Sequence, residues 1–108
     1  MPANASDNDN VIRLYGLSDP ECEAAFKEGQ RLVRLKRADR VVRMVTPAGV
    51  KSVSVRGYWG GHFTLLRERG EVRLIGVFGR VLARDRRFEV VLGALRDHSQ
   101  AAGVLAKR

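Results

Sequence analysis

The stretch from Val50 to Arg80 constrains the fold of this chain more than any other part. Its sequence, VKSVSVRGYWGGHFTLLRERGEVRLIGVFGR, holds most of the strand pattern, the single Trp and a dense set of glycines. Apolar residues alternate with polar ones, as in strands that bury one face. The predicted strands are 41–46, 50–56, 62–68 and 71–78. We expect them to form an antiparallel meander whose core contains Val53, Val55, Phe63, Leu65, Val72 and Leu74.

A helix is predicted to begin directly after Ser18. Ser18 can cap it, Pro20 stands in its first turn, and Glu21 completes a capping box. Apolar and small residues then recur every three or four positions, which predicts one stripe packed on the sheet. The stripe is Cys22, Ala25, Phe26, Gly29, Leu32 and Val33. The short alternation Val11–Tyr15 predicts one more strand before this helix.

Residues 81–92 permit two interpretations. They form a further hairpin before a helix over about 94–106, or Asp85 caps a helix that starts earlier. The second helix would carry the stripe Phe88, Val91, Leu92, Leu95 and Ala102. Arg86 and Arg87 at a helix N-terminus oppose its dipole, which slightly favours the hairpin. Both interpretations predict the α+β class, a small antiparallel sheet of four or more strands packed by an N-terminal and a C-terminal helix.

The length of 108 residues suits a single domain with one core. Residues 1–10 are polar and acidic and are expected to be a disordered tail, which leaves 11–108 as one basic domain. The start resembles no signal peptide, and the apolar runs are too short to span a bilayer. We therefore expect a cytoplasmic protein without a membrane partner.

Charge is the compositional outlier, with 20 Lys and Arg against 12 Asp and Glu, a net charge of +8. Residues 1–30 hold six acids and two bases, a balance of −4, so residues 31–108 carry +12. A body this basic attracts phosphate polymers or acidic proteins. The plain alternative is the codon composition of an Arg-rich bacterial or mobile-element sequence.

The densest basic segment follows the predicted helix. Bases three positions apart share a helix face, at a repeat suited to successive phosphates. The alternative is a solvated helix end. The segment contains Arg31, Arg34, Lys36, Arg37, Arg40 and Arg43.

The connection from Gly57 to His62 places Tyr58 and Trp59 among glycines, next to Arg56. Aromatic rings beside a cation can stack on nucleic-acid bases. The alternative is that one of the rings closes the end of the core.

A second glycine pair lies in the segment from Gly76 to Gly79, where GVFG resembles the GxxG clamp of KH domains. A clamp of that kind joins two helices, whereas the residues before Gly76 have the pattern of a strand. We interpret these glycines as relieving crowding in a strand or at a bulge.

Motifs for catalysis or metal binding are weak. Cys22, His62 and His98 lack short ligand spacing, and the sequence has no nucleophile triad and no phosphate-binding P-loop. We expect no metal and no cofactor, and a non-enzymatic protein is favoured over an enzyme.

One enzymatic alternative remains. His62, together with Arg56, Tyr58, Arg67 and Arg73 on a sheet, has residue types that can cleave RNA. In size, charge and order of elements the chain resembles RelE-like ribosome-associated ribonuclease toxins. This resemblance implies ribonuclease activity but assigns no catalytic residue.

The leading prediction is a small, basic, non-enzymatic nucleic-acid-binding module for DNA or RNA. The alternatives are the ribonuclease and a protein-interaction or inhibitor module that docks on an acidic partner. A homodimer through an edge strand, 11–15 or 41–46, is also predicted. The predicted nucleic-acid-binding residues are Arg34, Arg37, Arg40, Arg43, Arg56, Tyr58, Trp59, His62 and Arg73.

Overall fold

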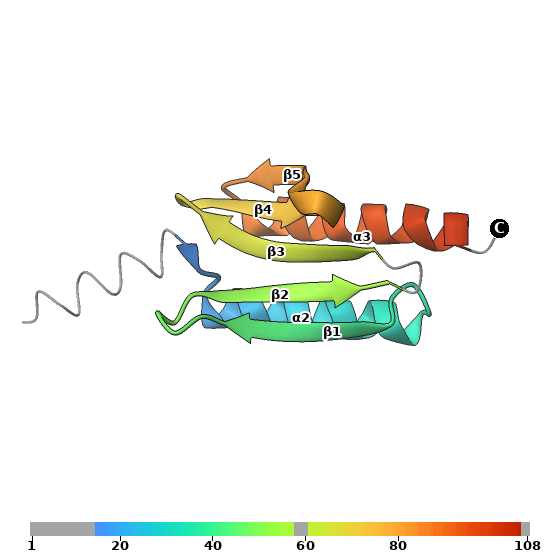
Figure 1. Cartoon of the computed structure of the whole chain (residues 1–108), viewed down its shortest axis with the longest axis horizontal. Helices are drawn as coiled ribbons and strands as arrows, with labels where there is room; N and C mark the ends of the chain where they lie inside the picture. The colour runs from blue at the N-terminus through green and yellow to red at the C-terminus, as the bar shows by residue number, and fades with distance from the viewer. Residues whose placement is uncertain (1–14, 58–60, 107–108) are drawn as a thin grey trace, which may run out of the picture.

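The structure is a computed structural model that describes residues 15–57 and 61–106, with side chains as far as Ser99. Five strands form one antiparallel sheet in sequential order, with a helix before it and a helix after it (Figure 1). The elements are α2 (Asp19–Arg34), β1 (Arg40–Val45), β2 (Lys51–Arg56), β3 (His62–Glu68), β4 (Glu71–Ile75), the short 3-10 helix η1 (Val77–Gly79), β5 (Val81–Asp85) and α3 (Phe88–Ala106). The predicted α+β meander with two flanking helices is confirmed.

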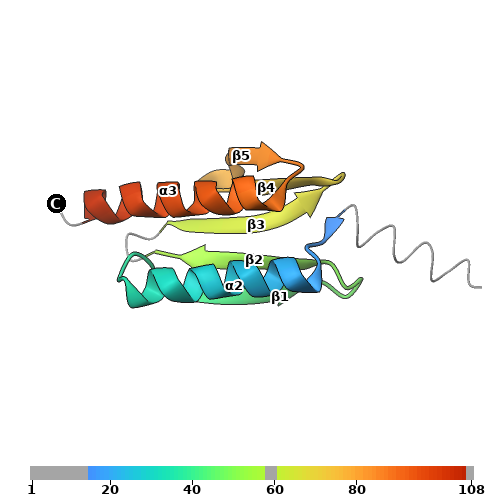
Figure 2. The same ribbon diagram turned by 180° about the vertical axis from the view of Figure 1, so that it is seen from behind.

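Both helices lie on the same side of the sheet, as the view from behind shows (Figure 2). α2 packs on β1 and β2, and α3 packs on β3, β4 and β5. The opposite side of the sheet has no helix over it among the described residues. We call this side the open face.

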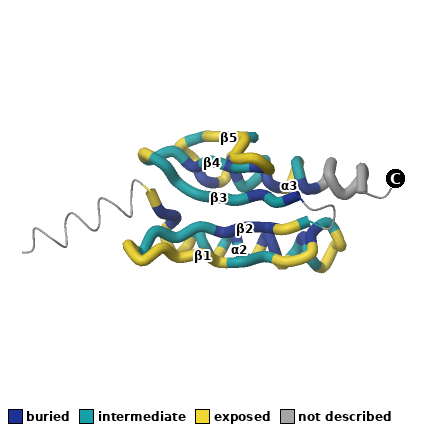
Figure 3. The backbone as a smooth tube through the Cα atoms, viewed as in Figure 1, coloured by how far each residue is buried: buried dark blue, intermediate teal, exposed yellow. Residues whose placement is uncertain are grey.

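The core lies between the sheet and the two helices. The six core residues predicted from the strand pattern are all buried, and Leu32 of α2 and Val91 and Leu95 of α3 cover them. Burying each such side chain contributes about 1.5–3 kcal/mol. Buried positions concentrate on the three inner strands, whereas β1 is mostly exposed or half-buried (Figure 3).

α2 begins as predicted. The Ser18 hydroxyl accepts a hydrogen bond from the Glu21 N–H, and the Glu21 carboxylate accepts one from the Ser18 N–H, at 3.3 and 2.9 Å. Gly29 lies on the buried side, where a Cβ atom would come within 2.5 Å of the Val41 Cγ2. The absence of a side chain at Gly29 therefore sets how closely α2 approaches β1.

α2 ends at Arg34, earlier than the run of bases suggests. Lys36 adopts a left-handed conformation with φ 58°. The Arg37 N–H donates to the Leu32 carbonyl and the Lys36 N–H to the Val33 carbonyl, which is a Schellman motif. The expectation that Arg37, Arg40 and Arg43 continue one helix face is therefore wrong.

Two further predictions are wrong, and two others fall mostly outside the described residues. The strand predicted over 71–78 ends at Ile75, and η1 follows it. Residues 81–92 contain β5 and the start of α3, so the slight preference for a hairpin was wrong. Arg86 and Arg87 stand directly before α3, where Asp85 pairs with Arg87 at 3.2 Å and Glu89 occupies the first turn, so acidic groups offset their charge at the helix N-terminus. The tail 1–10 and most of the strand 11–15 lie outside the described residues.

Candidate functional site

The open face is defined by the alternation of side chains along the strands. Val53, Val55 and Phe63 point toward the helices, so their neighbours point the other way. The open face therefore carries Ser54 and Thr64 at its centre, and their hydroxyl oxygens lie 3.0 Å apart.

One row of the open face consists of basic side chains. Arg40 of β1 is the direct cross-strand neighbour of Arg56 of β2, and Arg56 is the direct neighbour of His62 of β3. We call these three residues the arginine row. Both arginines are exposed, and within the described part of the chain neither has a carboxylate partner. Directly opposed like charges destabilise a sheet, so this pair is unfavourable for folding alone.

The end of α2 lies next to the arginine row. Arg34 and Arg40 line the same shallow hollow of about 350 Å³, together with Asp39. Asp39 is the acid nearest in sequence to the arginine row, and it forms no ion pair among the described residues. Arg37 is half-buried in the turn that follows α2. Arg34, Arg40 and Arg56 thus gather at one corner of the sheet, where β1 begins and β2 ends.

Two of the predicted phosphate-binding arginines are engaged within the protein. Arg43 lies on the helix side of β1, where its Nη2 is 2.9 Å from the Glu23 Oε2 and its guanidinium carbon is 4.0 Å from the centre of the Phe26 ring. Arg73 lies on the open face and pairs with Glu68 at 2.9 Å and Glu71 at 3.1 Å. These contacts give both arginines a structural role.

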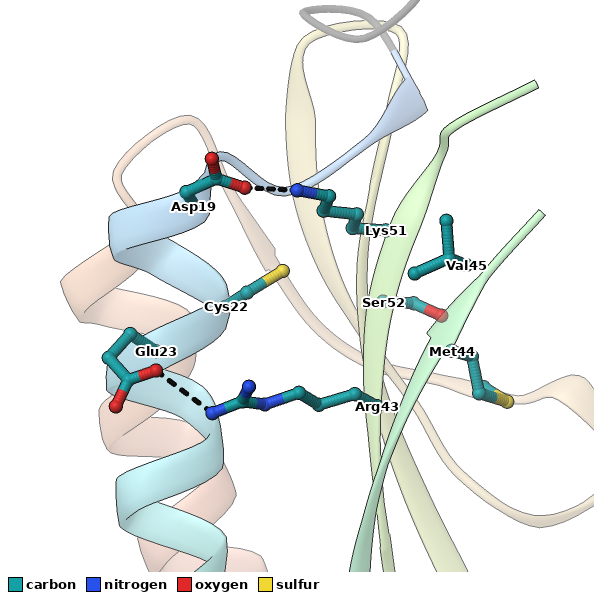
Figure 4. A pocket seen from close by; sticks show the side chains of 8 residues that line it. All are labelled: Asp19, Cys22, Glu23, Arg43, Met44, Val45, Lys51 and Ser52. Carbon is teal, nitrogen blue, oxygen red and sulfur yellow. Dashed lines mark hydrogen bonds and ion pairs between the residues drawn. The ribbon is translucent and has the colours of Figure 1, made fainter. Parts of the chain in front are cut away.

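A pocket of about 310 Å³ opens between α2, the end of β1 and the start of β2 (Figure 4). Its charged groups are neutralised in pairs, Lys51 with Asp19 and Arg43 with Glu23. The Cys22 side chain points from α2 toward β2. Burial raises the pKa of the Cys22 thiol, which disfavours the reactive thiolate. This pocket therefore offers neither a free charge nor an activated nucleophile.

The residues named for RNA cleavage are divided between the two faces of the sheet. His62 and Arg56 are neighbours on the open face, but Arg67 lies on the helix side, where it donates to the Glu21 carboxylate and the Gly16 carbonyl. Tyr58 and Trp59 lie outside the described residues.

One exposed residue was missed by the sequence reasoning. The strand pattern placed Phe78 inside a strand, but it lies on the connection between β4 and β5, and its side chain is 101% exposed. Its backbone is left-handed, with φ 64°. The only signal was its place between two glycines, which also permits a turn.

No three His, Cys, Asp or Glu side chains in the described ranges lie close enough to hold a metal ion. None of the described helices is long and apolar enough to cross a membrane. Comparison with protein-family models, with curated proteins and with solved structures finds no match to this chain. The open face and its arginine row therefore form the candidate functional site.

Proposed function

We propose that this chain is a small, non-enzymatic, cytoplasmic module that binds nucleic acid by contacting phosphates with the arginine row. The observation that carries this proposal is the direct opposition of Arg40 and Arg56 without a carboxylate partner in the described structure. A phosphate between two guanidinium groups turns their repulsion into attraction. Arg also matches phosphate geometry, because its planar fork donates two parallel hydrogen bonds.

The surroundings of the arginine row support a phosphate chain rather than a single small anion. The row crosses three strands, which span about 10 Å at the usual strand spacing. Arg34, at the end of α2, adds a base beside the row, since it lines the same hollow as Arg40. The charge of +12 on residues 31–108 adds a long-range attraction that a compact ligand would not need.

The proposal is tested by measuring fluorescence polarisation of labelled single-stranded DNA, single-stranded RNA and duplex DNA with nuclease-treated protein. The log of the affinity should fall linearly with the log of the salt concentration. Each phosphate contact contributes about 0.7 to 0.9 to the slope, so the two arginines of the row alone predict a slope of about 1.4 to 1.8. Absence of binding to all three probes at about 50 mM salt would contradict the proposal.

An acidic protein partner is the second candidate. It is favoured by the edge strand β1, where Met44 and Val45, at the opposite end of the strand from Arg40, are 41% and 61% exposed. An extended acidic segment can add to an open strand edge by backbone hydrogen bonds. Recovery of the same partner from nuclease-treated and untreated lysate would favour this candidate, since a nucleic-acid tether is lost on treatment.

Pairing of β1 with β1 of a second copy stays a prediction.

A further inference from the structure

The turn that presents Phe78 to solvent is closed by backbone hydrogen bonds. The Gly76 N–H donates to the Arg80 carbonyl at 2.7 Å and the Gly79 N–H to the Gly76 carbonyl at 3.2 Å. Phe78 stands between these glycines with its side chain 101% exposed. The nearby Val77 and Val81 are also exposed, at 39% and 45%, so the segment presents further apolar surface beside Phe78 in the sequence.

This arrangement is unfavourable for folding alone. A bulky residue in the left-handed region is strained relative to a right-handed conformation, and Gly would avoid that strain. The exposed ring gains nothing from burial. Strain and exposure at the same residue point to a function that needs an aromatic ring at this position.

Phe78 lies at the same end of the sheet as the arginine row. Ile75, the last residue of β4, is paired with Thr64, and Arg56 is paired with His62 at the start of β3. The turn that carries Phe78 therefore leaves β4 at the end of the sheet where β2 ends and β3 begins. Arg80, exposed and without a carboxylate partner in the described ranges, follows Phe78 by two positions.

We propose that Phe78 is a stacking platform for an unpaired base, so that the preferred ligand is single-stranded nucleic acid. This inference rests on the proposed function. A nucleotide carries both a flat base and an anionic phosphate. The base can stack on Phe78, and the phosphate can bind Arg56 or Arg80 at the same end of the sheet. In a duplex the base faces are stacked on each other, so Phe78 reaches them only if the duplex opens.

The test compares three probes of equal length, namely an oligothymidine strand, an abasic strand with the same phosphates, and a duplex. Wild-type protein should bind the oligothymidine roughly tenfold more tightly than the abasic strand, because one stacked base contributes on the order of 1–3 kcal/mol. F78A should lose this difference, while its salt dependence stays that of the wild type. F78W should keep the difference.

V90A is the matched control, because Val90 is an exposed apolar residue, 43% accessible, on α3. It should behave as wild type on all three probes. If F78A still prefers oligothymidine over the abasic strand, or if wild type shows no such preference, the stacking role is wrong although phosphate binding stands. If no probe binds, the abasic strand included, the proposed function fails as well, and the two failures are thus distinguished.

Discussion

Arg67 and Glu21 join the sheet to the start of α2 through two parallel hydrogen bonds, Nη1 to Oε1 and Nη2 to Oε2, each 2.7 Å long. Both side chains are largely buried, at 15% and 19% exposure. Arg67 also donates to the Gly16 carbonyl, and Glu21 also accepts from the Ser18 N–H. A capping residue of the helix is thus also its anchor on β3.

This pair predicts an acid-sensitive contribution to stability. Burial alone would raise the pKa of Glu21, but the hydrogen bonds from Arg67 and from the Ser18 N–H lower it below its ordinary value. A lowered pKa in the folded state means that the contribution is present above the ordinary pKa and is lost as the pH falls through the lowered one. Stability should therefore decline below about pH 5.

The E21Q variant measures that contribution. At neutral pH it should unfold about 1–3 kcal/mol more easily than wild type in urea, because charged hydrogen bonds are lost. The difference should shrink at acid pH, once the wild-type carboxylate has taken up its proton. R67K is the companion variant, since it keeps the charge and loses the fork. An equal difference between E21Q and wild type at both pH values would show that the ionised pair is not the cause.

Substitution of Gly29 tests the packing of α2 on β1. In G29A the new Cβ atom meets the Val41 side chain at 2.5 and 2.8 Å, and a β-branched side chain yields little. We expect a net loss of about 1–2 kcal/mol in the free energy of unfolding, after the gain in helix propensity is counted.

The matched control is G93A in α3, where a Cβ atom meets no heavy atom within 4 Å. The same replacement should there stabilise the protein by about 0.5–1 kcal/mol. Urea midpoints of the two variants should thus move in opposite directions, and a shift of the same sign in both would contradict the close approach of α2 to β1.

The left-handed backbone of Lys36 leads to a third prediction about stability. K36G should stabilise the protein by up to about 1 kcal/mol, because Gly accepts the φ of 58° at the end of α2 without strain. K36A removes the same charge but keeps the strain, so its urea midpoint should stay near that of wild type. If K36A stabilises as much as K36G, the effect belongs to the charge and not to the backbone.

The opposed arginines Arg40 and Arg56 predict that one substitution has opposite effects on stability and on nucleic-acid binding. R56Q should raise the free energy of unfolding by about 0.2–1 kcal/mol, because it removes a repulsion across the strands from Arg40. It should at the same time weaken nucleic-acid binding. If R56Q instead lowers the free energy of unfolding measured in urea, Arg56 has a stabilising partner in the fold.

The sequence predicted the scaffold well, because strand alternation and the Ser18 capping box are local patterns that the tertiary structure respects. Prediction from the sequence failed where a residue other than glycine adopts a left-handed backbone conformation. Lys36 occupies the position where Gly usually ends a helix, so the end of α2 was hidden in a run of bases. Phe78 lies in the turn between β4 and β5 with a left-handed backbone. Because aromatic residues are typical of strands, the sequence pattern assigned this turn to a strand.

The candidate site was predicted only in part, for a related reason. Counting bases along the chain does not show which are neutralised by acids distant in sequence, as Arg43 is by Glu23 and Arg73 by Glu68. The opposition of Arg40 and Arg56 depends on the register between β1 and β2. The sequence did not determine the length of the turn between these strands, so their register could not be predicted. Tyr58 and Trp59 stay predictions, since they lie outside the described residues.

The most direct test of the central claim is the salt dependence of nucleic-acid binding by the double variant R40Q/R56Q, compared with wild type and with R86Q. Arg86 is an exposed arginine at the other end of the sheet, between β5 and α3. If the arginine row contacts phosphates, the log-log slope of the double variant should be smaller than that of wild type by about 1.4 to 1.8. R86Q should keep the wild-type slope. Equal slopes for the double variant and R86Q would show that binding follows net charge alone and would contradict the assignment of the arginine row.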